Sequence, residues 1–199
     1  MSLSNIEEIA TFIVADGKGI LAADESNPTC GKRFDSIGVD STEENRRDYR
    51  ELLFRSKGMK GNIGGVILFD ETIRQKAKDG TLLRDIISDQ GALPGIKVDK
   101  GLQPIEDCPN ETVTVGLDGL DERLKEYSSM GAKFTKWRAV INIGDGIPTD
   151  KCIDANMQAL ADYAKCAQDN GMVPIVEPEV LMDGEHNIDQ CFEATERSL

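Results

Sequence analysis

The chain has 199 residues, of which 39% are hydrophobic and 30% charged, and its formal net charge is −13. This composition is typical of a water-soluble globular protein, and the length suits one domain with a sizeable core. The acidic balance argues against binding to nucleic acid or to an anionic membrane, since phosphate backbones require clustered lysine and arginine. Any phosphate bound here must therefore meet a local group of cations.

The cysteines and the N-terminus indicate a cytoplasmic protein. The five cysteines are widely spaced and form no C-x-x-C pair, which argues against a disulfide framework and against a thiolate metal site. The first residues carry Glu7 and Glu8 where a targeting segment would be basic or apolar. No apolar run approaches the roughly 18 residues that a membrane-spanning helix needs.

In chain order, the first half alternates helix and strand. Ser4 with Glu7 has the spacing of a capping box and predicts a helix start, and Ser41 with Glu44 predicts another. Apolar stretches at 19–26, 63–71 and 95–101 predict strands, because a nearly continuous apolar run is typical of a strand buried on both faces.

The second half continues the alternation. Apolar residues at helical spacing predict a helix before Gly131 and a longer one before Gly171, and each glycine suits a helix C-terminus. Strands are expected at 132–140 and 172–180, and a last helix without a C-terminal cap at 187–199. With no linker or composition shift, we expect one domain spanning residues 1–199.

All five predicted strands finish on charged residues, which is where α/β enzymes place their chemistry. The fold class is therefore α/β with a parallel sheet. A closed (β/α)8 barrel needs eight strands and about 250 residues, so a complete one would not fit in this chain. In an open five-stranded sheet, the first and last strands would be edges without a second partner.

Three same-face polar pairs stand out, since residues two apart in a strand project to one side. Cations there suit anionic oxygen, and Arg138 can hold a phosphate or carboxylate with two parallel hydrogen bonds. Two neighbouring carboxylates suit a proton donor and a proton acceptor. The alternative is a set of internal salt bridges. The pairs are Lys97 with Asp99, Lys136 with Arg138, and Glu177 with Glu179.

A second candidate follows the first strand. Asp24 ends that strand, and Ser26 and Thr29 provide hydroxyls in a loop with Lys32 and Arg33 just beyond. This segment could hold a phosphate, although such residues are also ordinary loop formers. The single histidine, His186, is expected to be exposed, and without a histidine cluster no metal site is predicted.

Seven motifs in order resemble class I fructose-bisphosphate aldolase: AADES, TEENRR, GGVILFDE, GIKVDKG, GLDGL, KWR and VEPE. The resemblance runs from about residue 5 to 199. It implies a (β/α)8 barrel of which about the first five β/α units are present. It also implies cleavage of fructose 1,6-bisphosphate through a Schiff base, with no cofactor or metal, in an enzyme that is commonly a tetramer.

The resemblance also implies residue roles. Asp24 would handle the hydroxyl whose deprotonation starts cleavage, and Glu177 would be the main acid/base group with Glu179 beside it. Lys136 would lower the pKa of the neighbouring imine-forming lysine. Substrate oxygens would be held by Lys97, Arg138, Ser26, Thr29 and Arg33, with Arg46 a weaker candidate. The family's DESTGS loop is DESNPT here, with Pro28 in place of glycine.

The imine-forming lysine of the family lies in a sixth-strand L-L-K-P motif, which these 199 residues do not contain. Three hypotheses remain open. The chain is part of an aldolase, or a catalytically inactive module that binds phosphosugars or another protein. The third is a different phosphosugar enzyme that transfers protons at Glu177.

Overall fold

The structure is a computed structural model that describes residues 3 and 5–199. The described residues form two compact units. The N-terminal unit contains the chain up to Lys97 together with 125–135 and 171–173, and the C-terminal unit contains 98–124, 136–170 and 174–199. The expectation of one domain stays a prediction.

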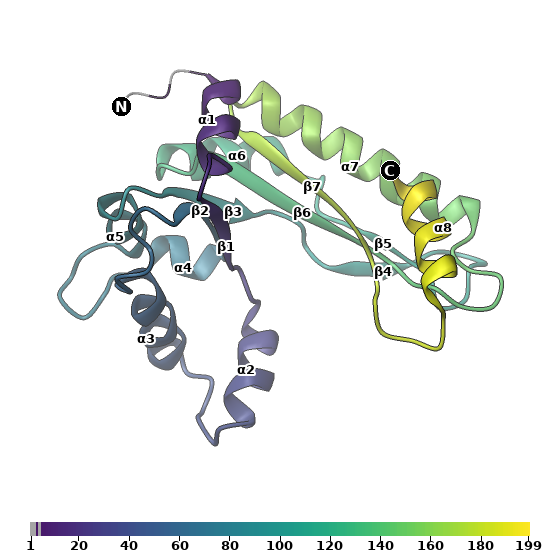
Figure 1. Ribbon diagram of the computed structural model, residues 1–199, viewed down its shortest axis with the longest axis horizontal. Coiled ribbons are helices and arrows are strands. Elements are labelled where there is room, and N and C mark those ends of the chain that lie inside the picture. Colours follow the sequence, from purple (N-terminus) through teal and green to yellow (C-terminus); the bar gives the residue numbers. More distant parts are fainter. Residues whose placement is uncertain (1–2, 4) are drawn as a thin grey trace. The chain divides into compact units, whose positions relative to one another are not determined.

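The main sheet consists of five hydrogen-bonded strands in the order β1-β2-β3-β6-β7 (Figure 1). The β1–β2 and β2–β3 pairs are parallel, with Ala23 opposite Leu68 and Leu68 opposite Ile96. All five predicted strands are confirmed, and β1 and β7 end the strand order as expected. Their bounds are β1 Gly19–Ala23, β2 Ile63–Leu68, β3 Leu93–Lys97, β6 Phe134–Ile141 and β7 Val173–Val180.

The first two predicted helices are present, and each is capped one residue later than predicted. Helix α1 (Ile6–Ile13) is capped by Asn5, which accepts from the Glu8 amide at 2.8 Å, while Ser4 lies outside the described residues. Helix α3 (Glu43–Phe54) is capped by Thr42 rather than by Ser41. The prediction was one residue early: the Thr42 hydroxyl accepts from the Asn45 amide at 3.1 Å, while the Ser41 hydroxyl accepts from Nη1 of Arg46 at 3.3 Å.

Helix α6 (Leu120–Ser129), α7 (Asp150–Asp169) and α8 (Ile188–Ser198) confirm the remaining predicted helices. Short elements were not foreseen, because each offers only a few residues of pattern. They are α2 (Asn27–Asp35), α4 (Asp70–Arg74), α5 (Leu83–Asp89) and the antiparallel pair β4 (Leu102–Pro104) and β5 (Thr112–Thr114).

The core of the N-terminal unit depends on glycine. The Phe134 ring lies directly over β2 and β3 at Gly65 and Gly95, and a β-carbon added to Gly65 would come within 2.8 Å of it. At Gly95 the added carbon would come closer still to the same ring. Glycine in these strands thus marks the close approach of an aromatic side chain.

The core of the C-terminal unit is built on a stacked aromatic pair. Trp137 of β6 and Tyr163 of α7 are fully buried, with ring centroids 5.3 Å apart. The Tyr163 hydroxyl donates to the carbonyl of Ile175 at 3.3 Å, which satisfies the polar end of the ring. These contacts fasten α7 to β6 and β7.

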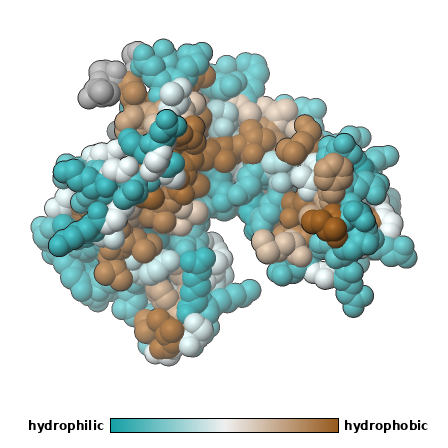
Figure 2. Space-filling model, viewed as in Figure 1, coloured by the Kyte–Doolittle hydropathy of each residue, from teal (hydrophilic) through white to brown (hydrophobic). Residues whose placement is uncertain are grey.

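Burial along the strands differs from the prediction for β7 and also for β1, in which only Ala23 is buried. In β2 every residue after Ile63 is buried, as expected. In β7 no residue is fully buried, and Val176 is 45% exposed. The expectation of burial on both faces was wrong there because β7 ends the strand order, and apolar side chains are also exposed over α8 (Figure 2).

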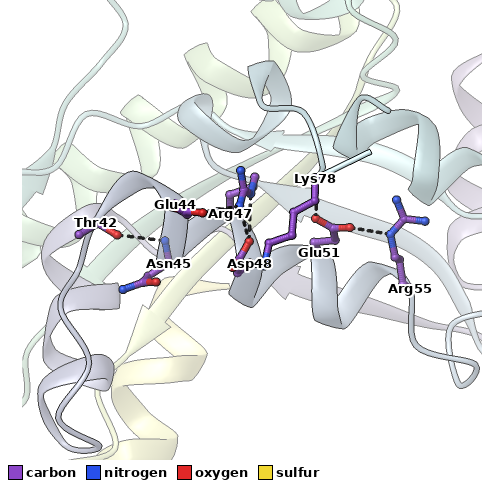
Figure 3. A network of polar contacts seen from close by, with 8 residues as sticks. All are labelled: Thr42, Glu44, Asn45, Arg47, Asp48, Glu51, Arg55 and Lys78. Carbon is purple, nitrogen blue, oxygen red and sulfur yellow. Dashed lines mark hydrogen bonds and ion pairs between the residues drawn. The ribbon is translucent and has the colours of Figure 1, made fainter. Parts of the chain in front are cut away.

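The outer face of α3 carries a chain of ion pairs (Figure 3). Asp48 contacts both Arg47 at 2.6 Å and Lys78 at 2.7 Å. Glu51 accepts from Nε of Arg55 at 2.8 Å and from the Lys78 backbone amide at 3.1 Å. The network ties α3 to the segment after α4.

None of the described helices is long and apolar enough to cross a membrane.

Candidate functional site

In the N-terminal unit, the candidate site begins where β1 ends. Asp24 follows β1 directly and is only 9% exposed. Ser26 is the N-cap residue of α2, and its hydroxyl lies 3.0 Å from that of Thr29. The expectation that Ser26 and Thr29 lie in a loop was wrong for Thr29, because helix α2 begins at Asn27. Pro28 fits its first turn, where a missing backbone N–H has no cost.

Glu25 links α2 to α3. Its nearly buried carboxylate accepts from Nη1 of Arg33 and from the Tyr49 hydroxyl, the latter at 3.2 Å. The charge of Glu25 raises the pKa of Arg33, and burial raises the pKa of Tyr49. The Arg33 side chain is nevertheless 56% exposed, so its guanidinium is anchored on one side and open to an anion on the other.

Arg46 is buried rather than open. Its guanidinium makes two hydrogen bonds to Glu71, at 2.8 and 2.5 Å, and contacts Ser41 as well. The hydrogen bonds to Glu71 raise the pKa of Arg46. With this many partners, Arg46 suits a structural role better than substrate binding.

Arg50 is the residue of this region that the sequence reasoning missed. It is fully buried and donates to two backbone carbonyls, those of Ala23 at 3.3 Å and Glu25 at 2.6 Å. The available signal was its spacing: Arg46 and Arg50 lie four residues apart on α3 and so share one face.

Lys97 is half-buried at the last position of β3. Since β1, β2 and β3 are parallel, Lys97 and Asp24 lie at the same carboxyl edge of the N-terminal unit's strands. Asp99 was expected in the same strand but lies beyond its end. Its carboxylate accepts from the Arg138 backbone amide, with 3.5 Å between Oδ2 and N.

In the C-terminal unit, cations of β6 face carboxylates of β7. Nζ of Lys136 lies 3.1 Å from Oε2 of Glu177, and Arg138 pairs with Glu179. The Lys136 side chain is 11% exposed and that of Glu177 36%. The two predicted same-face pairs are thus brought together across the strands, so the salt-bridge interpretation holds for their geometry.

The same ion pairs could also transfer protons. A carboxylate in contact with an ammonium group has a proton donor within hydrogen-bond reach, which is the first requirement for acid/base work. Both carboxylates remain partly open to solvent, so a ligand can reach them. The pairs therefore serve as salt bridges and as a candidate proton-transfer site together.

Metal-ligating and thiol groups are dispersed. Among the described residues, no group of three or more histidine, cysteine, aspartate or glutamate side chains could hold a metal ion. All five cysteines are free, and burial raises the pKa of Cys152 to about 11. His186 is half-buried rather than exposed, so that expectation was wrong.

A family model described as fructose-bisphosphate aldolase class-I matches residues 5–199. The chain belongs to the class I fructose-bisphosphate aldolase family. A probable class 1 aldolase from Xanthomonas campestris is 56% identical over 199 residues, which cover all of this chain and 60% of that protein. A cytosolic fructose-bisphosphate aldolase 4 from Arabidopsis thaliana is 53% identical over 96% of this chain and 48% of its own length.

A solved aldolase structure shares the fold. The Plasmodium falciparum fructose-bisphosphate aldolase, solved in complex with TRAP and a small-molecule inhibitor, matches with a TM-score of 0.89 and 46% identity. That match covers 96% of this chain and 58% of the other. The aldolase-like α/β fold and the family prediction are confirmed. This aldolase-family chain spans about half to 60% of the length of these relatives.

Proposed function

We propose that the complete gene product reversibly cleaves fructose 1,6-bisphosphate to dihydroxyacetone phosphate and glyceraldehyde 3-phosphate. The observation that carries this proposal is the family match over residues 5–199, together with curated relatives that bear the aldolase name. The contact between Lys136 and Glu177 supports it, because aldol cleavage requires proton transfer at a positioned carboxyl group.

The acid/base roles are assigned to four residues. Glu177 transfers the main proton, with Glu179 beside it, and Asp24 handles the substrate hydroxyl that is deprotonated as the carbon–carbon bond breaks. Lys136, an ammonium next to Glu177, supplies positive charge that favours a neutral amine on a neighbouring lysine. By resemblance, the imine-forming lysine belongs to a motif that these residues do not include.

Substrate binding is assigned to cations and hydroxyls. Ser26 and Thr29 lie in the first turn of α2, where backbone N–H groups and the helix dipole favour a phosphate. Arg33 lies in the same helix and exposes half of its side chain. Lys97 and Arg138 complete the set, and Arg46 stays a weaker candidate because Glu71 occupies it.

The resemblance further supports a cytoplasmic enzyme that uses neither metal nor organic cofactor and assembles as a homo-oligomer, commonly a tetramer. A second function is favoured by one observation: the 199 residues lack the L-L-K-P motif. By themselves they would form an inactive module that binds phosphosugars.

The deciding experiment traps the imine. The purified protein is incubated with dihydroxyacetone phosphate, reduced with borohydride and weighed by intact mass spectrometry. An adduct on a chain longer than 199 residues supports the aldolase, and phosphate binding without an adduct supports the inactive module. An adduct on the 199-residue chain would assign the nucleophile to Lys136 or Lys97, and Lys136→Met and Lys97→Met would show which one.

A further inference from the structure

The backbone of the segment that carries Asp24 accepts two hydrogen bonds from one side chain. Arg50 of α3 is fully buried, and it donates from Nε to the carbonyl of Ala23 at 3.3 Å and from Nη2 to that of Glu25 at 2.6 Å. These carbonyls belong to the residues immediately before and after Asp24. A single guanidinium therefore fixes the backbone on both sides of the proposed catalytic carboxylate.

The electrostatics of this cluster explain why the buried cation is tolerated. Nη2 of Arg50 lies 3.8 Å from Oε2 of Glu25, so the charge has a carboxylate partner. The two backbone carbonyl oxygens accept from Nε and Nη2, an arrangement that a planar guanidinium matches and a single ammonium does not, while Nη1 is buried without a hydrogen-bond partner among the described residues. The Glu25 carboxylate in turn accepts from Arg33. Arg50 therefore contacts the backbone beside Asp24 directly and reaches Arg33 through Glu25.

Asp24 lies between two elements of regular structure. β1 ends at Ala23 and is the first strand in the sheet order, so its hydrogen-bonded ladder runs to β2 alone. Helix α2 begins only at Asn27, which leaves residues 24–26 outside regular structure. The Arg50 hydrogen bonds act on the backbone of this segment, between the end of the strand and the start of the helix.

We infer that Arg50 is a positioning residue for Asp24: it orients the carboxylate through its two flanking carbonyls and touches no substrate. The inference rests on the proposed function, which assigns the hydroxyl of the substrate to Asp24. A misplacement of about 1 Å in a reacting group can cost about 100-fold in rate, so the hold on this segment has a kinetic consequence.

The test compares four variants of the complete gene product. Arg50→Lys keeps the charge but loses the fork, Arg50→Ala leaves space for added guanidinium ion, and Asp24→Asn removes the carboxylate itself. Arg55→Ala is the matched control, because Arg55 is on the same helix and makes ion pairs at 2.8 and 2.6 Å but is 42% exposed. Folded fraction, kcat and KM for fructose 1,6-bisphosphate are measured for each.

The expected result is a drop in kcat of about 10- to 100-fold for Arg50→Lys at full folded fraction, with KM changed far less. Guanidinium should restore turnover to Arg50→Ala and not to Asp24→Asn, and Arg55→Ala should retain wild-type kcat. The inference is overturned if kcat of Arg50→Lys falls only in proportion to the folded fraction.

An activity-independent measurement separates this inference from the proposed function. Amide hydrogen exchange at residues 24–26 should accelerate in Arg50→Lys, while exchange in β2 stays slow. An unchanged exchange rate at 24–26 would overturn the inference even in an active enzyme. Absence of turnover in the wild-type protein would refute the proposed function, and the exchange rates would then decide the role of Arg50 alone.

Discussion

The segment after β1 and the strand pair β6–β7 hold their candidate catalytic groups in opposite ways. Asp24 is held through its backbone, by a buried arginine that binds the carbonyls on either side. Glu177 and Glu179 are held through their side chains, by ion pairs with Lys136 and Arg138 that remain partly exposed. One arrangement fixes a position, and the other leaves the charged ends free to exchange partners.

The difference indicates which groups can move when a ligand arrives. Partly exposed ion pairs contribute about 0–1 kcal/mol, so Arg138 can leave Glu179 for an anionic ligand at little cost. A buried arginine bound to backbone carbonyls cannot do so without leaving its partners unpaired. We therefore expect Arg138 to bind substrate directly and Arg50 to act only as support.

The largest expected effect is on turnover at β7. Glu177→Gln removes the proton carrier and leaves the shape, so kcat should fall by about 10²- to 10⁴-fold while substrate affinity is kept. Steady-state kinetics of the complete gene product measure both. Glu193→Gln, a substitution at an exposed position of α8, is the control. Unchanged turnover in Glu177→Gln would refute the acid/base role.

The stability of the N-terminal unit depends on the absence of a side chain at Gly95. A β-carbon there would collide with the Phe134 ring, so Gly95→Ala should lower the free energy of unfolding by about 1–3 kcal/mol. Gly19→Ala is the matched control, since nothing lies within 4 Å of the added carbon. Urea unfolding measures both variants, and equal stabilities would contradict the close approach of the ring.

A smaller effect is expected for binding at Lys97. Lys97→Ala should weaken affinity for fructose 1,6-bisphosphate by about 10- to 100-fold, because a hydrogen bond to a charged group contributes about 1.5–3 kcal/mol. Calorimetry in a Glu177→Gln background keeps the substrate intact during the measurement. Lys100→Ala, at an exposed position three residues on, should bind normally. Unaltered affinity in Lys97→Ala would count against a phosphate contact.

These two regions also show what the sequence could reveal. Apolar runs predicted the five strands, and the two-residue spacing predicted that Lys136 and Arg138 share a face. Their pairing with Glu177 and Glu179 depends on the register between strands, which the sequence does not contain. Arg50 was missed because it binds backbone carbonyls, which every residue has and which therefore leave no trace in the sequence. An arginine among charged neighbours is also expected to be exposed.

The helix α2 shows a different limit. Its start at Asn27 was hidden because Pro28 is typical of loops, although proline is also favoured in the first turn of a helix. The segment is too short for an apolar stripe to decide between these interpretations. Its hydroxyls at Ser26 and Thr29 were nevertheless identified, and the structure places them 3.0 Å apart.

The smallest effect concerns the exposed ion pairs on α3, which contrast with buried Arg50 on the same helix (Figure 3). Hydrogen bonds from Lys78 and Arg47 lower the pKa of Asp48 from its ordinary value of 3.8. A depressed pKa stabilises the folded state above the unfolded pKa, and this contribution is lost as the pH falls through the folded value. Because the Lys78 side chain is 64% exposed and that of Asp48 33%, the ion pair contributes only about 0–1 kcal/mol, and Lys78→Ala should leave the thermal midpoint nearly unchanged.

The pH dependence sharpens that prediction. Any difference between Lys78→Ala and the wild-type protein should be constant from pH 7 to about pH 5, should shrink as the pH falls below 3.8, and should disappear only below the lowered folded pKa, where Asp48 is protonated in both states. Thermal unfolding across this range measures it. A difference that grew on acidification would mean that Lys78 stabilises the chain through a group other than Asp48. By contrast, removal of the Arg50 guanidinium should destabilise the fold at every pH in that range, because both of its hydrogen-bond acceptors are backbone carbonyls that do not titrate, although its longer ion pair with Glu25 at 3.8 Å does.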